Sequence, residues 1–368
     1  MLAGVAGVLL LLVILWDAFE TIVLPRRVQR RVRVARLFYQ LTWRPTAAVA
    51  RQMGPGRETF LSFFGPLSLL LLIVIWAVSL LMGFALVQFA AGSAWSSSTG
   101  AYPDFATDVY ASGTTFFTLG LGDVVPQSPL ARALVVAEVG TGFAFLALVI
   151  SYLPILYQSF SAREKTVSLL DGRAGTPPSA AELVRRNVCA GRLDLLEGLL
   201  HDWERWSADL LETHLSYPVL AYYRSQHDKQ SWVSALTVVL DACALVMAIA
   251  PGHSARQAQF TYAIARHAAG DLSQVFGTQP RPPRTDRLPS ADAARLWQAL
   301  ERSGLQLPSD TRAEQYLKEL REGYEPYVGA LAEYLLMDLP RWVPEPGALD
   351  DWEVTAWGTM PRIEVAGD

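Results

Sequence analysis

The stretch Thr118-Leu119-Gly120-Leu121-Gly122-Asp123 lies between two long apolar segments, and this arrangement decides the fold. Residues 59–103, on its N-terminal side, carry no charged side chain, and residues 130–160, on its C-terminal side, carry only Arg132 and Glu138. A further apolar run occupies residues 2–24. Because roughly 20 apolar residues in a helix span the hydrocarbon core of a bilayer, each run is long enough to cross a membrane. We therefore predict three transmembrane helices.

The composition divides the chain into two parts. Of its 368 residues 51% are hydrophobic; they concentrate in the first 160 residues, whereas charged residues crowd the remainder. This division predicts a membrane part followed by a cytoplasmic part. Both cysteines, Cys189 and Cys243, fall in the second part without metal-ligand spacing, which fits a reducing cytoplasm. Since neither a nucleotide-binding fingerprint nor a nucleophile–base set occurs, we expect no enzyme and no bound metal.

The segment just before the quoted stretch is too short and too polar to span a membrane. Residues 104–117 have helical spacing, Asp104 can cap the N-terminus of this helix, and Asp108 suits its first turn. We predict a short helix that enters the membrane and returns, as the pore helix of a channel does. The partial negative charge at its C-terminal end then favours a cation in the cavity below.

The two glycines of the quoted stretch give it a chemical meaning. An ion filter replaces the water around an ion with rings of backbone carbonyls. Successive carbonyls can face one axis only if the backbone alternates in hand, and glycine reaches positive φ at low cost. We predict that a filter binds ions through Thr118, Leu119, Gly120, Leu121 and Gly122, with the Thr118 hydroxyl at its inner end. The Asp123 carboxylates would concentrate cations at the outer mouth.

With the flanking helices, this motif resembles that of the potassium-channel pore family, particularly bacterial two-helix pore modules and two-pore-domain channels. The resemblance covers residues 60–158, and the family pattern TxTTVGYGD aligns with Thr115-Phe116-Phe117-Thr118-Leu119-Gly120-Leu121-Gly122-Asp123. It implies a passive, potassium-selective channel of four identical chains, with K⁺ as permeant ion and no cofactor. Phe117 replaces the first threonine of the usual pair, and Leu121 replaces a tyrosine whose hydroxyl braces the filter. Alternatives are a weakly selective monovalent cation channel, or a membrane-tethered signalling or scaffold protein with a non-conducting pore.

The third apolar run carries the residues expected to open and close the path. By its spacing from the filter, Gly142 matches the inner-helix hinge glycine of the family, although tight packing in a tetramer explains it equally well. Pro154 should kink this helix near its cytoplasmic end. We expect Leu146 and Ile150 to face the inner cavity, where a hydrophobic ring can close the path by dewetting.

Glu138 is a carboxylate within the same apolar run and needs a partner there. Ser112, Thr114 and Thr115 of the pore helix are the candidates. We predict that Glu138 braces the filter from behind, in place of the hydroxyl missing at Leu121. The alternative is a carboxylate that reaches interfacial water.

An arginine-rich loop sets the orientation. It follows the first apolar run and contains no acidic residue between Arg26 and Arg57. Positive residues stay on the cytoplasmic side, so we predict a multi-pass cell-membrane protein with its N-terminus outside and its C-terminal domain cytoplasmic. The loop should contact anionic headgroups rather than nucleic acid. We expect Asp17 and Glu20 to form an interfacial salt-bridge cluster with the first arginines of the loop, Arg26 and Arg27. The first helix has no arginine ladder for sensing voltage.

The second half of the chain predicts a bundle of about six helices, regulated by a cytoplasmic ligand that the sequence does not identify. The apolar stretch 232–250 is interpreted as a buried core helix rather than a fourth span, since Asp241 lies at its centre. The whole chain is thus an all-α membrane protein with three transmembrane helices, a re-entrant pore helix with its filter, and a cytoplasmic α-helical domain. Its predicted domains are an N-terminal helix with the arginine-rich loop (1–58), a pore module (59–160), a linker (161–178), a cytoplasmic helical domain (179–339) and an irregular tail (340–368).

Overall fold

The computed structural model describes residues 1–24, 33–97, 103–188, 192–226, 229–250, 253–283, 285–307, 312–345, 354–355 and 358–359. The chain is mostly helical and forms two compact units. Unit 1 contains Met1–Val49 and Phe63–Gln158, and unit 2 contains Ala50–Ser62 and Ser159–Asp368. The chain therefore enters unit 2 briefly before it returns to unit 1 and completes the pore segment.

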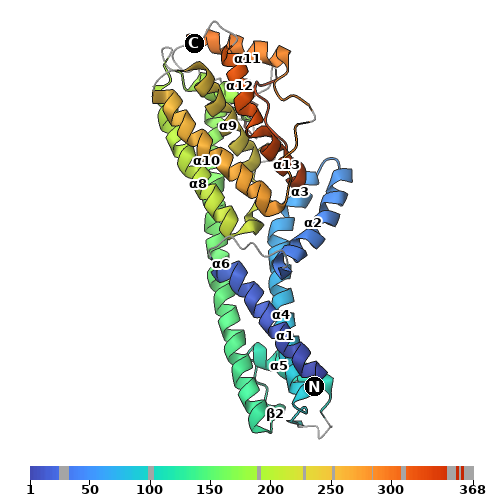
Figure 1. Ribbon diagram of the computed structural model, residues 1–368. Helices are drawn as coiled ribbons and strands as arrows, with labels where there is room; N and C mark the ends of the chain where they lie inside the picture. Colours follow the sequence, from blue (N-terminus) through green and yellow to red (C-terminus); the bar gives the residue numbers. More distant parts are fainter. Residues whose placement is uncertain are drawn as a thin grey trace. The chain divides into compact units, whose positions relative to one another are not determined.

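Unit 1 is built from apolar helices. Its elements are α1 (Leu2–Ala18), which ends in the π-helical turn η1 (Phe19–Val23), α2 (Val34–Gln52), α4 (Phe64–Ala90), the strand β1 (Trp95–Ser97), α5 (Phe105–Phe116), the strand β2 (Val124–Pro126) and the first part of α6 (Pro129–Ala174). Helix α1 runs along α4 (Figure 1), and the backbones of Gly7 and Gly83 approach so closely that no side chain fits between them. Trp76, Leu80, Phe116 and Phe145 form part of the buried core.

Among the residues that the structure describes, four helical segments are long and apolar enough to cross a membrane: Leu2–Val23, Arg57–Ala90, Pro129–Ala174 and Trp232–Ile249. The first three coincide with the apolar runs from which transmembrane helices were predicted. The fourth lies in the centre of unit 2, where most of its residues are buried by other parts of the chain.

The prediction of a loop between the first two apolar runs was wrong for residues 34–52, which form α2. Ala35, Phe38, Trp43 and Ala47 of this helix are buried at spacings of three to five residues, whereas its arginines, at positions 36, 44 and 51, are exposed. The amphipathic pattern of this helix was missed in the sequence because the segment contains many arginines. Arg26, Arg27, Arg30 and Arg31 lie outside the described residues.

The two carboxylates near the end of α1 have different partners. Asp17 accepts hydrogen bonds from the Trp76 indole at 3.0 Å and from the Ala35 backbone N–H at 3.1 Å, so it holds the start of α2. Glu20 pairs with Arg33 at 3.4 Å. An arginine of the predicted loop therefore does reach Glu20, while the predicted partners Arg26 and Arg27 are not among the described residues.

Unit 2 is a bundle around one central helix. It comprises α3 (Arg57–Ser62), the end of α6, α7 (Ala180–Arg186), α8 (Asp194–Ser216), the 3₁₀ turn η2 (Pro218–Tyr222), α9 (Trp232–Ile249), α10 (His253–Phe276), α11 (Ser290–Arg302), α12 (Arg312–Glu322) and α13 (Glu325–Leu335). Helices α7, α8, α10, α12 and α13 pack against α9. Sixteen of the 18 residues of α9 are buried. In the tail, predicted to be irregular, β3 (Val354–Thr355) pairs with β4 (Gly358–Thr359).

Asp241 in the middle of α9 is fully buried and has charged partners. Both its oxygens accept hydrogen bonds from Arg287, at 3.0 and 2.6 Å, and the Tyr324 hydroxyl also donates to it. Arg287 reaches Glu325 at 3.1 Å as well. The carboxylate is thus satisfied inside the bundle by a bidentate arginine, which explains how α9 holds a charge among apolar neighbours.

Arg163 fastens the end of α6 within unit 2. Its guanidinium donates to the carbonyl oxygens of Leu220 at 2.8 Å and Tyr223 at 2.9 Å, and it pairs with Glu164 at 2.9 Å. The same group lies 3.1 Å from Nε2 of His214, a fully buried histidine on α8. A buried guanidinium with this many partners holds α6 in one position against η2 and α8.

Candidate functional site: a pore segment

The short helix predicted for residues 104–117 is confirmed as α5. Asp104 accepts a hydrogen bond from the Thr107 N–H at 2.9 Å, and the Thr107 hydroxyl accepts one from the Asp104 N–H, so the two residues form a reciprocal cap. Asp108 is fully buried and accepts hydrogen bonds from the Trp95 indole and the Ser93 hydroxyl, both at 2.7 Å. The first turn of α5 is therefore tied to the loop that precedes it.

A short antiparallel ladder holds the segment that follows the predicted filter. Strand β1 pairs with β2 in the register Trp95↔Pro126, Ser96↔Val125 and Ser97↔Val124. The Gln127 N–H continues this contact to the Ala94 carbonyl at 2.8 Å. Residues 118–123 are consequently fixed at both ends, by α5 on one side and by β2 on the other.

The sign of φ alternates along residues 118–122. Thr118, Gly120 and Gly122 have positive φ values of 57°, 54° and 79°, whereas Leu119 and Leu121 do not. The glycines were expected to supply this alternation; Thr118 was not. Two backbone hydrogen bonds hold the turn at Thr118. The Thr118 N–H donates to the Thr115 carbonyl at 3.0 Å, and the Leu119 N–H donates to the Thr114 carbonyl at 2.7 Å. This alternation is the conformation that lets successive carbonyls point the same way.

Glycine is needed at position 142 for a reason other than positive φ. A Cβ at this position would overlap the Phe116 carbonyl oxygen and lie 3.1 Å from the carbonyl carbon. At Gly120 and Gly122 an added Cβ meets nothing within 4 Å, so there the positive φ is what requires glycine. Gly142 therefore allows α6 to touch the last turn of α5 within one chain.

Glu138, predicted to brace the filter, lies beside α5. The side chain is fully buried, and the Ser112 hydroxyl donates to one of its oxygens at 3.4 Å. Its other oxygen is buried with no hydrogen-bond partner among the described residues. Of the three partners proposed from the sequence, Ser112 is the one in contact.

A contact that the sequence did not reveal joins α5 to Asp123, at the end of the predicted filter. The Tyr110 hydroxyl donates to the Asp123 carboxylate at 2.8 Å. The two residues are 13 positions apart, across the turn at the end of α5. A tyrosine two turns before that end was the available signal, but only the fold shows that the chain doubles back far enough for contact.

Seven of the exposed apolar residues of α6 form a regular seam. Val136, Val139, Phe143, Leu146, Ile150, Leu153 and Tyr157 alternate at spacings of three and four and are exposed in the single chain. Leu146 and Ile150, expected to line the path, both belong to it. The helix runs on past Pro154 to Ala174. A three-four pattern is typical of a helix that packs against other helices.

A small apolar cavity brings several candidate residues together. It has a volume of about 300 Å³, and Thr118, Gly142 and Leu146 lie on its wall beside Phe117 and Phe143. Ile150 and Pro154 do not line it. Within the described residues, no group of three His, Cys, Asp or Glu side chains could hold a metal ion.

An apolar helix, a short helix ending in backbone of alternating hand, and a second apolar helix together define the pore module of an ion channel. Residues 68–159 match the model of a family described as "Ion channel". This match confirms, over residues 68–159, the resemblance seen in the motif at residues 115–123.

The chain is also similar to a bacterial membrane protein, the "Uncharacterized membrane protein YdjJ" of Bacillus subtilis (strain 168). The two are 26% identical over 197 residues, which are 52% of this chain and 56% of the relative. The chain thus spans little more than half the length of the curated relative it matches. No solved structure matches the chain significantly.

Proposed function

We propose that four copies of the chain surround one axis and form a passive, potassium-selective channel. The filter comprises Thr118 to Gly122, and its backbone carbonyls replace the water around a K⁺ ion. One observation carries this proposal: φ is positive at three alternate residues of the stretch. An ordinary surface loop has no need of this repeated alternation, particularly at a threonine.

The charges around the stretch favour a cation. Helix α5 ends at Phe116, directly before the filter, so its partially negative C-terminus lies next to the inner end. At the outer end, Asp123 supplies one carboxylate from each chain. The pore therefore attracts cations at both ends of the filter and repels anions.

Three helices cross the membrane in this proposal: α1, α4 and the first part of α6. The arginines exposed on α2 lie on the cytoplasmic side, in contact with anionic headgroups, which places the N-terminus outside. Helix α9 does not span, because its faces are covered by other helices of unit 2 and Arg287 binds the Asp241 carboxylate. Unit 2 is then a cytoplasmic domain that regulates the channel.

The seam of α6 lines the path below the filter. Four seams around one axis make rings of Leu146 and Ile150, and such apolar rings close a pore by excluding water. Gly142 and Pro154 are the positions at which the helix can bend. The seam also accounts for the large apolar side chains, such as Phe143, that a single chain leaves exposed.

Rubidium flux tests the channel directly. We expect the purified chain, reconstituted into lipid vesicles, to carry rubidium and potassium at least about tenfold faster than sodium. Gly120→Ala should abolish this flux, because alanine disfavours the positive φ by roughly 1–2 kcal/mol in each of four chains. The control is Gly198→Ala on α8, where an added Cβ meets nothing within 4 Å. If the reconstituted chain carries no monovalent cation, the result contradicts the channel and favours a scaffold function.

The sodium measurement decides between strict and weak selectivity. Leu121 offers no hydroxyl to brace the filter, and this favours a weakly selective monovalent channel as the second candidate. Glu138 and Tyr110 are the groups available to replace that brace. If Glu138 does so through Ser112, Glu138→Gln should lower the rubidium-to-sodium flux ratio; an unchanged ratio would assign Glu138 to packing alone.

A further inference from the structure

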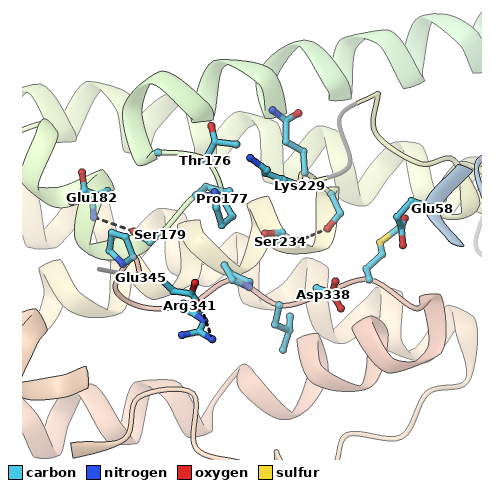
Figure 2. A pocket seen from close by; sticks show the side chains of 18 of the residues that line it. Glu58, Thr176, Pro177, Ser179, Glu182, Lys229, Ser234, Asp338, Arg341 and Glu345 are labelled. Carbon is cyan, nitrogen blue, oxygen red and sulfur yellow. Dashed lines mark hydrogen bonds and ion pairs between the residues drawn. The ribbon is translucent and has the colours of Figure 1, made fainter. Parts of the chain in front are cut away.

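Unit 2 contains a polar cavity of about 820 Å³ that none of the candidate pore residues lines. Four segments form its wall: Glu58 of α3, the linker after α6 together with α7, Arg224 with residues 229–234, and the segment 337–345 (Figure 2). Its volume is within the range of sites that hold small metabolites. The cavity is therefore large enough for a ligand rather than a few waters.

The wall is rigid on two sides. Pro177 and Pro178 form the linker side, and Pro340 and Pro344 form the opposite segment. Because proline fixes its own φ, these segments lose little freedom when a ligand binds. A preformed wall of this kind increases affinity by reducing the entropy that binding costs.

The charged side chains of the wall favour an anion. Five are basic and four are acidic; the basic ones are Arg185, Arg186, Arg224, Lys229 and Arg341. Glu182 is shared by Arg185 and Arg186, at 2.9 Å from each, so two guanidiniums meet one carboxylate. Arg224 pairs with Glu58 at 3.5 Å, and Arg341 pairs with Glu345 at 2.9 Å, where both members are mostly exposed. The wall therefore has a net positive charge.

Uncharged polar groups also line the cavity. Oγ1 of Thr176 and Oε1 of Gln230 are buried and have no hydrogen-bond partner among the described residues. The hydroxyls of Ser179, Ser231 and Ser234 lie on the same wall. Buried polar atoms are almost always hydrogen-bonded, so the two orphaned atoms indicate an occupant that can accept from the Thr176 hydroxyl and donate to the Gln230 amide oxygen.

We propose that this cavity binds a small ligand bearing a phosphate group and that its occupancy acts on α6. Arginine forks match the oxygens of a phosphate, and lysine adds a point charge. The hydroxyl-bearing residues of the wall suit the remaining phosphate oxygens. The action on α6 rests on the proposed channel function; the binding site does not.

Two lining residues connect the cavity to α6. The Gln230 amide donates to Asp171, and Arg186 donates to the Gly172 carbonyl at 3.3 Å, both in the last turns of the helix. The linker that follows α6, residues 175–179, is itself part of the wall. A phosphate that draws Arg186 or Gln230 toward it changes how the end of α6 is held.

Titration calorimetry of the full-length chain in detergent, with inorganic pyrophosphate as the probe, tests the site. We expect saturable binding that is at least about fivefold weaker in the double variant Lys229→Gln, Arg341→Gln. Both side chains belong to exposed or mostly exposed residues, so the variant should fold, and its thermal unfolding checks this. Arg205→Gln, an exposed arginine of α8 that does not line the cavity, should bind like the parent chain.

Vesicles distinguish a soluble phosphate from a lipid headgroup. If pyrophosphate does not bind but phosphatidylcholine vesicles containing phosphatidic acid stabilise the parent chain and not the double variant, the phosphate belongs to a lipid. Failure of both probes overturns the site. Binding of the probe without rubidium flux supports the binding site and contradicts the proposed channel. Rubidium flux without binding of the probe supports the channel and contradicts the site. Flux that saturating probe leaves unchanged overturns the action on α6.

Discussion

Gly140 and Gly142 are two residues apart on α6 but have unequal surroundings. An added Cβ at Gly142 overlaps the Phe116 carbonyl oxygen, whereas at Gly140 it meets nothing within 4 Å. We predict that Gly142→Ala abolishes rubidium flux, because overpacking costs roughly 1–3 kcal/mol per chain and pushes α6 away from the helix that carries the filter. Gly140→Ala should conduct like the parent. Equal flux in the two variants would show that close packing at Gly142 is unimportant.

Tyr110 provides a test of what holds the outer end of the proposed filter. Its hydroxyl donates to the Asp123 carboxylate, and a hydrogen bond to a charged group contributes about 1.5–3 kcal/mol. Tyr110→Phe removes this bond and little else, so we expect the rubidium-to-sodium flux ratio to fall by about tenfold. Tyr316→Phe, on α12 of unit 2, is the matched control. A ratio that stays constant in both variants would mean that the ladder of β1 and β2 alone holds the filter.

At the scale of elements, the junction of α6 with α8 depends on an uncharged histidine. Nδ1 of His214 lies 2.9 Å from the Leu210 carbonyl oxygen, and Nε2 lies 3.1 Å from the Arg163 guanidinium. The neutral ring with its proton on Nδ1 satisfies both contacts, since it donates to the carbonyl and accepts from the arginine. Burial and the charge of Arg163 hold the pKa of His214 well below its usual range.

The stability of the chain should therefore depend on pH through His214. In the unfolded chain this histidine titrates near pH 6.5, as a free histidine does. Below that pH the unfolded chain binds a proton that the folded chain does not, so the free energy of unfolding decreases as the pH falls. Each unit of pKa difference contributes about 1.4 kcal/mol. Thermal unfolding should show a lower midpoint at about pH 5.5 than at about pH 7.5.

The variant His214→Gln should reduce this pH dependence, because glutamine can accept from Arg163 without titrating. His201→Gln changes a half-exposed histidine on the same helix and should leave the dependence as it is. If both variants respond to pH like the parent, groups other than His214 determine the acid sensitivity.

At the scale of the whole molecule, the proposal requires four chains. One filter strand cannot surround an ion, and the exposed seam of α6 needs partners. We expect native mass spectrometry of the detergent-purified chain to give four times the monomer mass of 40.5 kDa. Replacing Phe143 in the seam with glutamate should shift the assembly toward smaller species. A purely monomeric parent chain would contradict the proposed pore.

Sequence reasoning succeeded where neighbouring residues determine the structure. The Asp104 cap, the helix after it and the hand of Gly120 and Gly122 all follow from local chemistry. It failed where segments distant in the chain meet. Nothing in the sequence brings Arg163 to His214, and the cavity of unit 2 is assembled from four separate segments. Helix α2 was missed for another reason: its charge was more conspicuous than its apolar stripe.

The course of the chain through its two units has a mechanical consequence. Residues 50–62 belong to unit 2, although residues before and after them belong to unit 1. Glu58 and Arg57 in this short excursion form ion pairs with Arg224 and Asp338, both at 3.5 Å. The chain therefore connects unit 2 to the pore segment at two places, directly before α4 and through α6. A change in the packing of unit 2 can reach the pore segment through either connection.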